Sequence, residues 1–175
     1  GSMADKISTV GASEKKLKEF RERYGEDAET KIDYCREELI NTVANLDKHV
    51  RFNIVLFDSE VRPWKKKLVP ASGRNSAIKF LSKLTTDALK RRTAKEDKGG
   101  TNTFAALNYC FGLKNEPQQK ASKNHKIEND TVFFLTDGMP TEGRMEDIEE
   151  MLRYFKVVNS RAKIVFHTLS FGVGN

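Results

Sequence analysis

The sequence predicts an α/β domain of three layers: a Rossmann-like, doubly wound and mostly parallel sheet, with helices on both faces and one antiparallel edge strand. Residues 131–135 and 163–170 are apolar at consecutive positions, as in parallel strands that are covered on both faces. Amphipathic helical patterns alternate with these runs, which is the order that builds a parallel sheet through helical crossovers. A length of 175 residues, 38% of them hydrophobic, favours a single core.

Two further strands are predicted in the first half of the chain. Residues 51–57 read Arg-Phe-Asn-Ile-Val-Leu-Phe, a run typical of a strand. Residues 60–64 can return beside it as a short antiparallel neighbour across Asp58 and Ser59. We expect Asp58 and Glu60 to serve this turn.

Four amphipathic helices are recognised by apolar residues that recur every three or four positions. Their apolar positions are Ile32, Cys35, Leu39, Val43 and Leu46 in the first; Ala77, Ile78, Leu81 and Leu84 in the second; Phe104, Leu107, Cys110 and Phe111 in the third; and Ile148, Met151, Leu152, Phe155 and Val158 in the fourth. Residues 85–98 and 114–130 are charged and lysine-rich, which indicates surface loops.

The composition narrows the class of partner. The formal charge of +6 suits an acidic partner, but the 31 basic residues are spread along the chain, so we do not expect nucleic acid to be bound. The densest cluster, residues 64–67 (Trp-Lys-Lys-Lys), could hold phosphate on an aromatic platform. Alternatively, its lysines could protect a solvated strand edge from aggregation, and we favour the strand edge.

Cys35 and Cys110 fall on apolar helix faces, which predicts buried thiols. No apolar run approaches the roughly 20 residues that span a bilayer, so we expect no membrane insertion by this segment.

Two polar motifs stand where ligands are expected. Asp137 and Gly138 follow the 131–135 run after a single threonine, and the carboxyl ends of strands are where open α/β sheets bind ligands. Residues 99–103 (Gly-Gly-Thr-Asn-Thr) open into the third helix, and their glycines permit a close backbone approach. A carboxylate and hydroxyl groups suit a hard cation such as Mg²⁺, with Mn²⁺ or Ca²⁺ as alternatives. The simpler interpretation is an Asp-Gly turn and a helix cap provided by Thr101 or Thr103.

The motifs together resemble the von Willebrand factor type A domain. The resemblance rests on residues 134–141 (Phe-Leu-Thr-Asp-Gly-Met-Pro-Thr), residues 99–103 and the strand at 52–57, in that family's order and spacing. It runs from about residue 31 to residue 174. We therefore expect residues 31–175 to form an A-type domain that lacks its first, central strand and its last helix, after an N-terminal insertion or tag-derived segment at residues 1–30.

The resemblance implies a metal-ion-dependent adhesion site. Thr101 would be the direct hydroxyl ligand and Asp137 the carboxylate, and the family takes its remaining ligands from an Asp-x-Ser-x-Ser loop. This chain has no such loop, although it begins Gly1-Ser2-Met3, as the end of that loop often reads. These three residues are either a remnant of an expression tag or the end of the loop, with Ser2 as its last ligand. We favour the second explanation.

The resulting hypothesis is a non-enzymatic module that binds an acidic group, the Asp or Glu carboxylate of a protein partner, through a divalent cation. One alternative is a magnesium-dependent hydrolase or phosphotransferase that uses Asp137, for which the sequence offers only Glu142 as a second nearby carboxylate. Another is a nucleic-acid-associated scaffold, which salt-dependent nucleic-acid binding would reveal. The sequence leaves the cellular compartment open.

Overall fold

The computed structural model describes residues 18, 22, 31–84, 100–113, 128–136 and 139–170. These residues fall into two compact units. The first unit holds residues 31–52 and 67–84, and the second holds residues 53–66, 100–113, 128–136 and 139–170.

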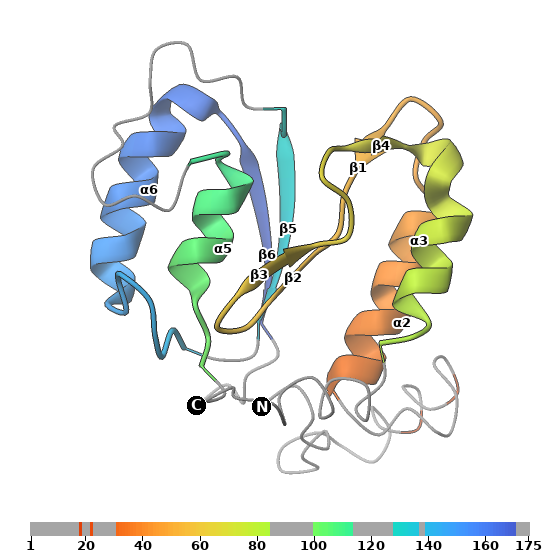
Figure 1. Cartoon of the computed structure of the whole chain (residues 1–175), viewed down its shortest axis with the longest axis horizontal. Helices are drawn as coiled ribbons and strands as arrows, with labels where there is room; N and C mark the ends of the chain where they lie inside the picture. Colours follow the sequence, from red (N-terminus) through yellow and green to blue (C-terminus); the bar gives the residue numbers. More distant parts are fainter. Residues whose placement is uncertain are drawn as a thin grey trace. The chain divides into compact units, whose positions relative to one another are not determined.

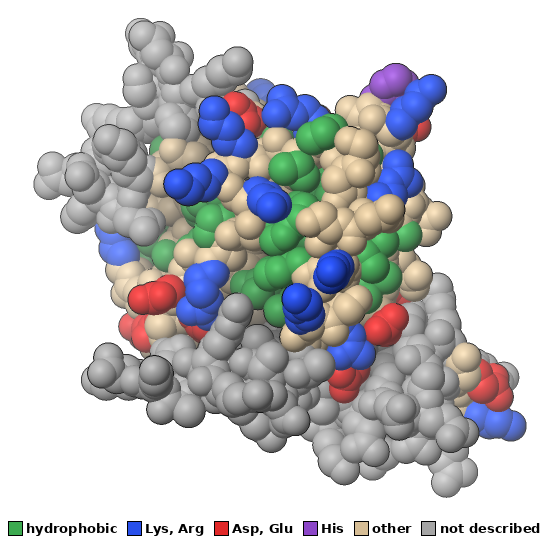
Figure 2. Space-filling model, turned by 45° about the vertical axis from the view of Figure 1, so that its right-hand side comes forward, with side chains coloured by type: hydrophobic (Ala, Val, Ile, Leu, Met, Phe, Trp, Pro, Cys, Tyr) green, Lys and Arg blue, Asp and Glu red, His purple; other side chains and the backbone are tan. Residues whose placement is uncertain are grey.

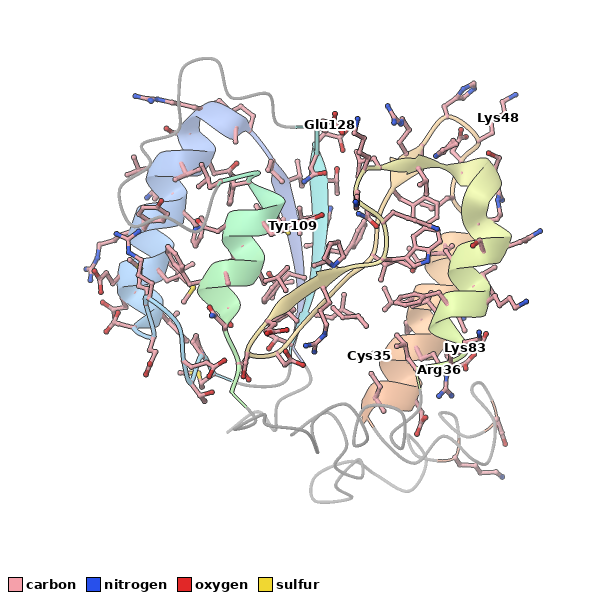
Figure 3. All side chains as sticks on the ribbon, in the orientation of Figure 1. Cys35, Arg36, Lys48, Lys83, Tyr109 and Glu128 are labelled. Atoms are coloured by element: carbon pink, nitrogen blue, oxygen red, sulfur yellow. The ribbon has the colours of Figure 1, made fainter. Side chains whose placement is uncertain are left out.

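The first unit is a helix pair with a short strand pair (Figure 1). Its elements are α2 (Lys31–Ala44), β1 (Arg51–Phe52), β4 (Val69–Pro70), a 3-10 turn (Ala71–Gly73) and α3 (Arg74–Leu81). α2 and α3 lie side by side, and β1 pairs with β4 in antiparallel register. Arg36 of α2 donates hydrogen bonds to Asp33 Oδ1 at 2.8 Å and to the carbonyl of Leu84 at 3.3 Å, beside Lys83 at the end of α3 (Figure 3).

The second unit holds the other strands and helices. Its elements are β2 (Val55–Phe57), β3 (Val61–Pro63), α5 (Thr103–Cys110), β5 (Thr131–Thr136), α6 (Ile148–Ala162) and β6 (Val165–Ser170). β2 and β3 form an antiparallel hairpin, whereas β5 and β6 are parallel, in a register from Thr131 opposite Val165 to Thr136 opposite Ser170. α5 and α6 cover the same side of the β5–β6 pair (Figure 1).

Aromatic side chains form the core in which α5 and α6 pack against β5 and β6. Phe155 of α6 lies with its ring centroid 5.5 Å from that of Phe104 and 5.3 Å from that of Phe111, and Phe111 in turn lies 5.5 Å from Phe166 of β6. Such ring separations lie in the range where aromatic pairs stabilise beyond the area that they bury. The buried core also contains Leu113, Met145, Met151, Val158 and Ile164.

The α/β class, the four helices, the hairpin at Asp58 and the parallel β5–β6 pair agree with the sequence prediction. The described strands form three two-stranded sheets, two of them antiparallel, and not one continuous sheet. The doubly wound strand order and the missing central strand stay predictions. Segments 1–30, 85–98 and 114–130 lie largely outside the described residues.

The predicted strand at 51–57 is divided into β1 and β2, and β4 was not predicted. Asn53 causes the division because its side chain takes over the backbone pairing. Its Oδ1 accepts hydrogen bonds from the N–H groups of Ile54 (2.9 Å) and Lys65 (3.1 Å), and its Nδ2 donates to the carbonyl of Lys65 (2.7 Å). An amide side chain that substitutes for ladder bonds interrupts a strand locally.

The basic residues of the 64–67 cluster are solvated, but they lie in a bend between β3 and β4 and not within a strand, so the choice between a strand edge and a phosphate platform stays a prediction. Lys65, Lys66 and Lys67 are exposed, and the Lys65 ammonium lies 4.9 Å from the centre of the Trp64 ring. Figure 2 shows one face of the molecule on which Lys and Arg side chains are spread among other residue types and do not form one continuous patch.

Candidate functional site

Two loops of the second unit are joined by a pair of hydrogen bonds. The loop before α5 carries Thr101, and the loop after β5 carries Thr141. The Thr101 N–H donates to Thr141 Oγ1 at 2.8 Å, and the Thr141 N–H donates to the carbonyl of Thr101 at 3.1 Å. Both bonds use backbone groups of Thr101, so neither of them involves the Thr101 hydroxyl.

Asn102 fixes the start of α5. Its Oδ1 accepts a hydrogen bond from the Ala105 N–H at 3.0 Å, and its own N–H donates to the carbonyl of Asp58 at 2.8 Å. The prediction that Thr101 or Thr103 caps this helix is therefore wrong, because the helix begins at Thr103 and Asn102 is the N-cap. Asparagine is as good an N-cap as any residue type, and the exact first residue of a helix is hard to predict.

The Asp58 turn supports the site through its backbone. Asp58 Oδ1 accepts a hydrogen bond from the Glu60 N–H at 2.9 Å, and the other carboxylate oxygen contacts the Arg62 guanidinium. The carboxylate is thus used within the hairpin, as the sequence predicted. The Asp58 carbonyl reaches the loop before α5, where it accepts the hydrogen bond from the Asn102 N–H.

Two glycines allow the paired loops to approach each other closely. A β-carbon built on Gly100 would overlap the carboxylate of Glu142, and one built on Gly143 would overlap the Asn102 amide. Gly143 also has a φ of 110°, which side chains rarely tolerate. The sequence predicted a close approach at the glycine loop, and the structure identifies the approaching group as a carboxylate of the chain itself.

Thr103 is a buried polar residue without a partner. Its side chain belongs to a residue that is 8% exposed, and within the described part of the chain its hydroxyl makes no hydrogen bond. A buried hydroxyl that forms no hydrogen bond costs about 1–3 kcal/mol, so its position calls for an explanation. Sequence reasoning named Thr103 only as a possible cap.

The predicted metal ligands are placed only in part. Thr101 lies in the paired loops, partly buried. Ser2 and Asp137 lie outside the described residues, so their distances to Thr101 are untested. Among the residues with described positions, no group of three or more His, Cys, Asp or Glu side chains could hold a metal ion.

Burial raises the pKa of two titratable groups on α5. Burial raises the pKa of the Cys110 thiol to about 11, and the pKa of Tyr109 (Figure 3) is raised by burial and by the neighbouring Cys110. Because the nucleophilic form of cysteine is the thiolate, Cys110 is inert at neutral pH. Cys35 is buried as predicted.

The second unit thus defines a class: an α/β domain in which a hydroxyl-bearing loop at a helix N-terminus is joined to the loop that follows a parallel strand. The model of the von Willebrand factor type A domain family matches residues 24–174, and the chain belongs to this family. None of the helices described here is long and apolar enough to span a membrane.

Curated relatives carry this domain within much longer chains. The chain is 29% identical to inter-alpha-trypsin inhibitor heavy chain H4 from Bos taurus over 81% of its length. It is 31% identical to heavy chain H3 from Homo sapiens and from Pongo abelii, over 74% of its length. In each comparison the match covers 14% of the relative, so the chain corresponds to one segment of these proteins.

Proposed function

We propose that the chain is a non-enzymatic protein-binding module, which captures an acidic side chain of its partner through a divalent cation held at the paired loops. The observation that carries this proposal is the pair of hydrogen bonds between Thr101 and Thr141. They hold the hydroxyl loop beside the loop that leaves β5, and the latter contains Asp137 in the sequence. Both motifs of the adhesion-site resemblance therefore belong to loops that are joined.

The donor groups fit a hard cation such as Mg²⁺. Thr101 would offer its hydroxyl and Asp137 its carboxylate, and Ser2 would add a second hydroxyl. The unpartnered Thr103 hydroxyl and the carboxylate that lies against Gly100 are polar oxygen groups at the same helix end, and Mg²⁺, Mn²⁺ and Ca²⁺ all bind oxygen. When bound, the cation supplies a positive charge that attracts a partner's carboxylate.

Charge and helix geometry favour an acidic partner. The chain carries a formal charge of +6, which assists the approach of anionic groups at low salt. The first turn of α5 contains no acidic residue, so the partial positive charge of its N-terminus favours a nearby anionic group. The relatives that share this domain are named inter-alpha-trypsin inhibitor heavy chains, and we propose a protein as the partner here too.

Thr101→Ala tests the metal site with little risk to the fold, because the bonds to Thr141 use the Thr101 backbone. We expect Mn²⁺ affinity, measured on the full chain by electron paramagnetic resonance of free Mn²⁺, to fall on the order of tenfold. Asp137→Asn should weaken binding at least as much. Thr131→Ala, an exposed threonine at the start of β5, is the matched control and should bind as the original chain does.

Ser2→Ala separates the two explanations of the first residues. A loss of Mn²⁺ affinity would support Ser2 as a ligand, and unchanged affinity would show that it is not one. If Thr101→Ala and Asp137→Asn both bind Mn²⁺ as tightly as the original chain, the site assignment is wrong. Catalytic turnover of a phosphate ester that depends on Mg²⁺ and on Asp137 would contradict the non-enzymatic part of the proposal.

A further inference from the structure

We propose that Glu142 is an internal ligand of this site: its carboxylate would bind the cation, and the acidic group of a partner would have to compete with it. The inference rests on the proposed function above, and it adds a regulatory residue to it. Glu142 would raise the affinity for the cation and lower the affinity for an acidic partner.

The position of Glu142 carries the inference. Its carboxylate lies against the α-carbon of Gly100, where any other residue would place a β-carbon. Gly100 directly precedes Thr101, so the carboxylate reaches the loop of the predicted hydroxyl ligand. Glu142 is only partly exposed, although a glutamate on a loop can otherwise extend fully into water.

The residues on either side hold Glu142 in this place. Thr141 before it is bonded twice to Thr101, and Gly143 after it lies against the Asn102 amide with a φ of 110°. Both neighbours of Glu142 are thus tied to the loop before α5. The backbone of Glu142 therefore lies beside the loop before α5, which brings its side chain within reach of Gly100.

The charge of Glu142 has no counterpart in the described part of the chain. The ion pairs among those residues use other acidic groups, namely Glu22, Asp33, Glu37, Asp58, Glu60 and Glu149. A partly buried carboxylate without a cationic partner is costly unless other groups compensate it. The N-terminus of α5 provides part of this compensation, and a bound cation would provide the rest.

The test compares Glu142→Gln with Glu146→Gln, which removes the same charge from an exposed position in the same connection. Mn²⁺ is titrated into the full chain, and water-proton relaxation at saturating Mn²⁺ measures the exchangeable water on the ion. We expect Glu142→Gln to lose on the order of tenfold in Mn²⁺ affinity and to show a larger relaxation enhancement, because water replaces the carboxylate. Acetate, as the probe for an acidic group, should then bind the Mn²⁺-loaded variant more tightly than the original chain.

A merely structural role for Glu142 at the helix end would change thermal stability but not the water content of the ion's shell. If Thr101→Ala weakens Mn²⁺ binding while Glu142→Gln and Glu146→Gln behave alike, the internal ligand is refuted and the proposed function stands. If the full chain binds no Mn²⁺, both proposals fall. Glu142→Asp keeps the charge with a shorter reach, and if Glu142→Gln fails to fold, loss of affinity in Glu142→Asp carries the test.

Discussion

Helices α5 and α6 share one aromatic core, but their surroundings differ. α6 is amphipathic: Met151, Phe155 and Val158 are buried, whereas Leu152 and Val157 on its other side are exposed. Every residue of α5 is buried or half-buried, and the buried ones include the polar residues Thr103 and Asn108. Hydrophobic packing accounts for the sequence of α6, but it does not account for the buried polar groups of α5.

The N-termini of the two helices differ in the same way. α6 is capped by Asp147, whose Oδ1 accepts from the Glu150 N–H at 2.7 Å, and its first turn adds Glu149 and Glu150. α5 is capped by the neutral Asn102 and has no acidic residue in its first turn. Acidic residues of its own thus compensate the dipole of α6, whereas the end of α5 is left to groups from elsewhere, first of all Glu142.

The largest effect is expected in the shared core. Phe155→Ala removes the ring between Phe104 and Phe111 and should lower the free energy of unfolding, measured with urea, by about 3–5 kcal/mol. Leu152→Ala, on the same helix at 65% exposure, should change it by no more than about 0.5 kcal/mol. A comparable loss in both variants would show that the outer side of α6 is covered in solution.

Thr103→Val tests whether the buried polar group of α5 is retained at a cost. Valine has the same shape and lacks the unpartnered hydroxyl, so thermal and urea unfolding should show a gain of about 1 kcal/mol. A loss of stability would mean that the hydroxyl has a partner in solution. If the gain is accompanied by weaker Mn²⁺ binding, the hydroxyl contributes to the site.

The difference between the helices also explains what the sequence could predict. The period of apolar residues was sufficient for α6 and the other helices, and two uninterrupted apolar runs were sufficient for the parallel β5–β6 pair. The break at Asn53 was not predictable, because it depends on hydrogen bonds to Lys65, a distant residue whose position follows from the hairpin. Local pattern does not report such non-local pairing.

The site was predictable to a similar extent. Residues 99–103 indicated a ligand-binding loop and a close backbone approach, and Thr101 does lie in the paired loops. The identity of the approaching group, Glu142, depends on the tertiary contact with Gly100. Three adjacent residues could each cap α5, and the choice of Asn102 follows from where the helix begins.

Changes of charge at the N-caps of α5 and α6 test whether the two helix dipoles are compensated differently. Asp147→Asn keeps the cap and should lower the free energy of unfolding by about 0.3–1 kcal/mol at low salt. Asn102→Asp adds a negative charge at the N-terminus of α5 and should raise the free energy of unfolding. The increase should be smaller than the decrease caused by Asp147→Asn, because the Glu142 carboxylate already lies at this end of α5.

The gain in unfolding free energy on Asn102→Asp should be larger in the Glu142→Gln background. The double-mutant cycle then gives a coupling energy between positions 102 and 142, and salt screening should reduce it in 1 M NaCl. Equal effects of Asn102→Asp in both backgrounds would place the charge of Glu142 away from the helix end in solution.

The smallest effect is expected at the C-termini, where the helices also differ. α5 is followed by Gly112 with a φ of 62°, whereas α6 is followed by its C-cap Lys163 with a φ of 59°. A non-glycine residue in this left-handed conformation is strained. Lys163 tolerates it because its N–H donates to the Asn159 carbonyl at 2.9 Å and the Asn159 side chain holds both the N–H and the carbonyl of Ile164, at 2.8 and 2.9 Å.

Lys163→Gly relieves this strain but increases the conformational entropy of the unfolded chain, so the net gain in unfolding free energy should be about 0.5 kcal/mol. Gly112→Ala, the reciprocal change at α5, should lower the stability, because alanine meets the same strain without an asparagine bridge after it. A loss on Lys163→Gly, measured by urea unfolding beside Gly112→Ala, would mean that the lysine side chain stabilises the end of α6 by more than its backbone strain costs.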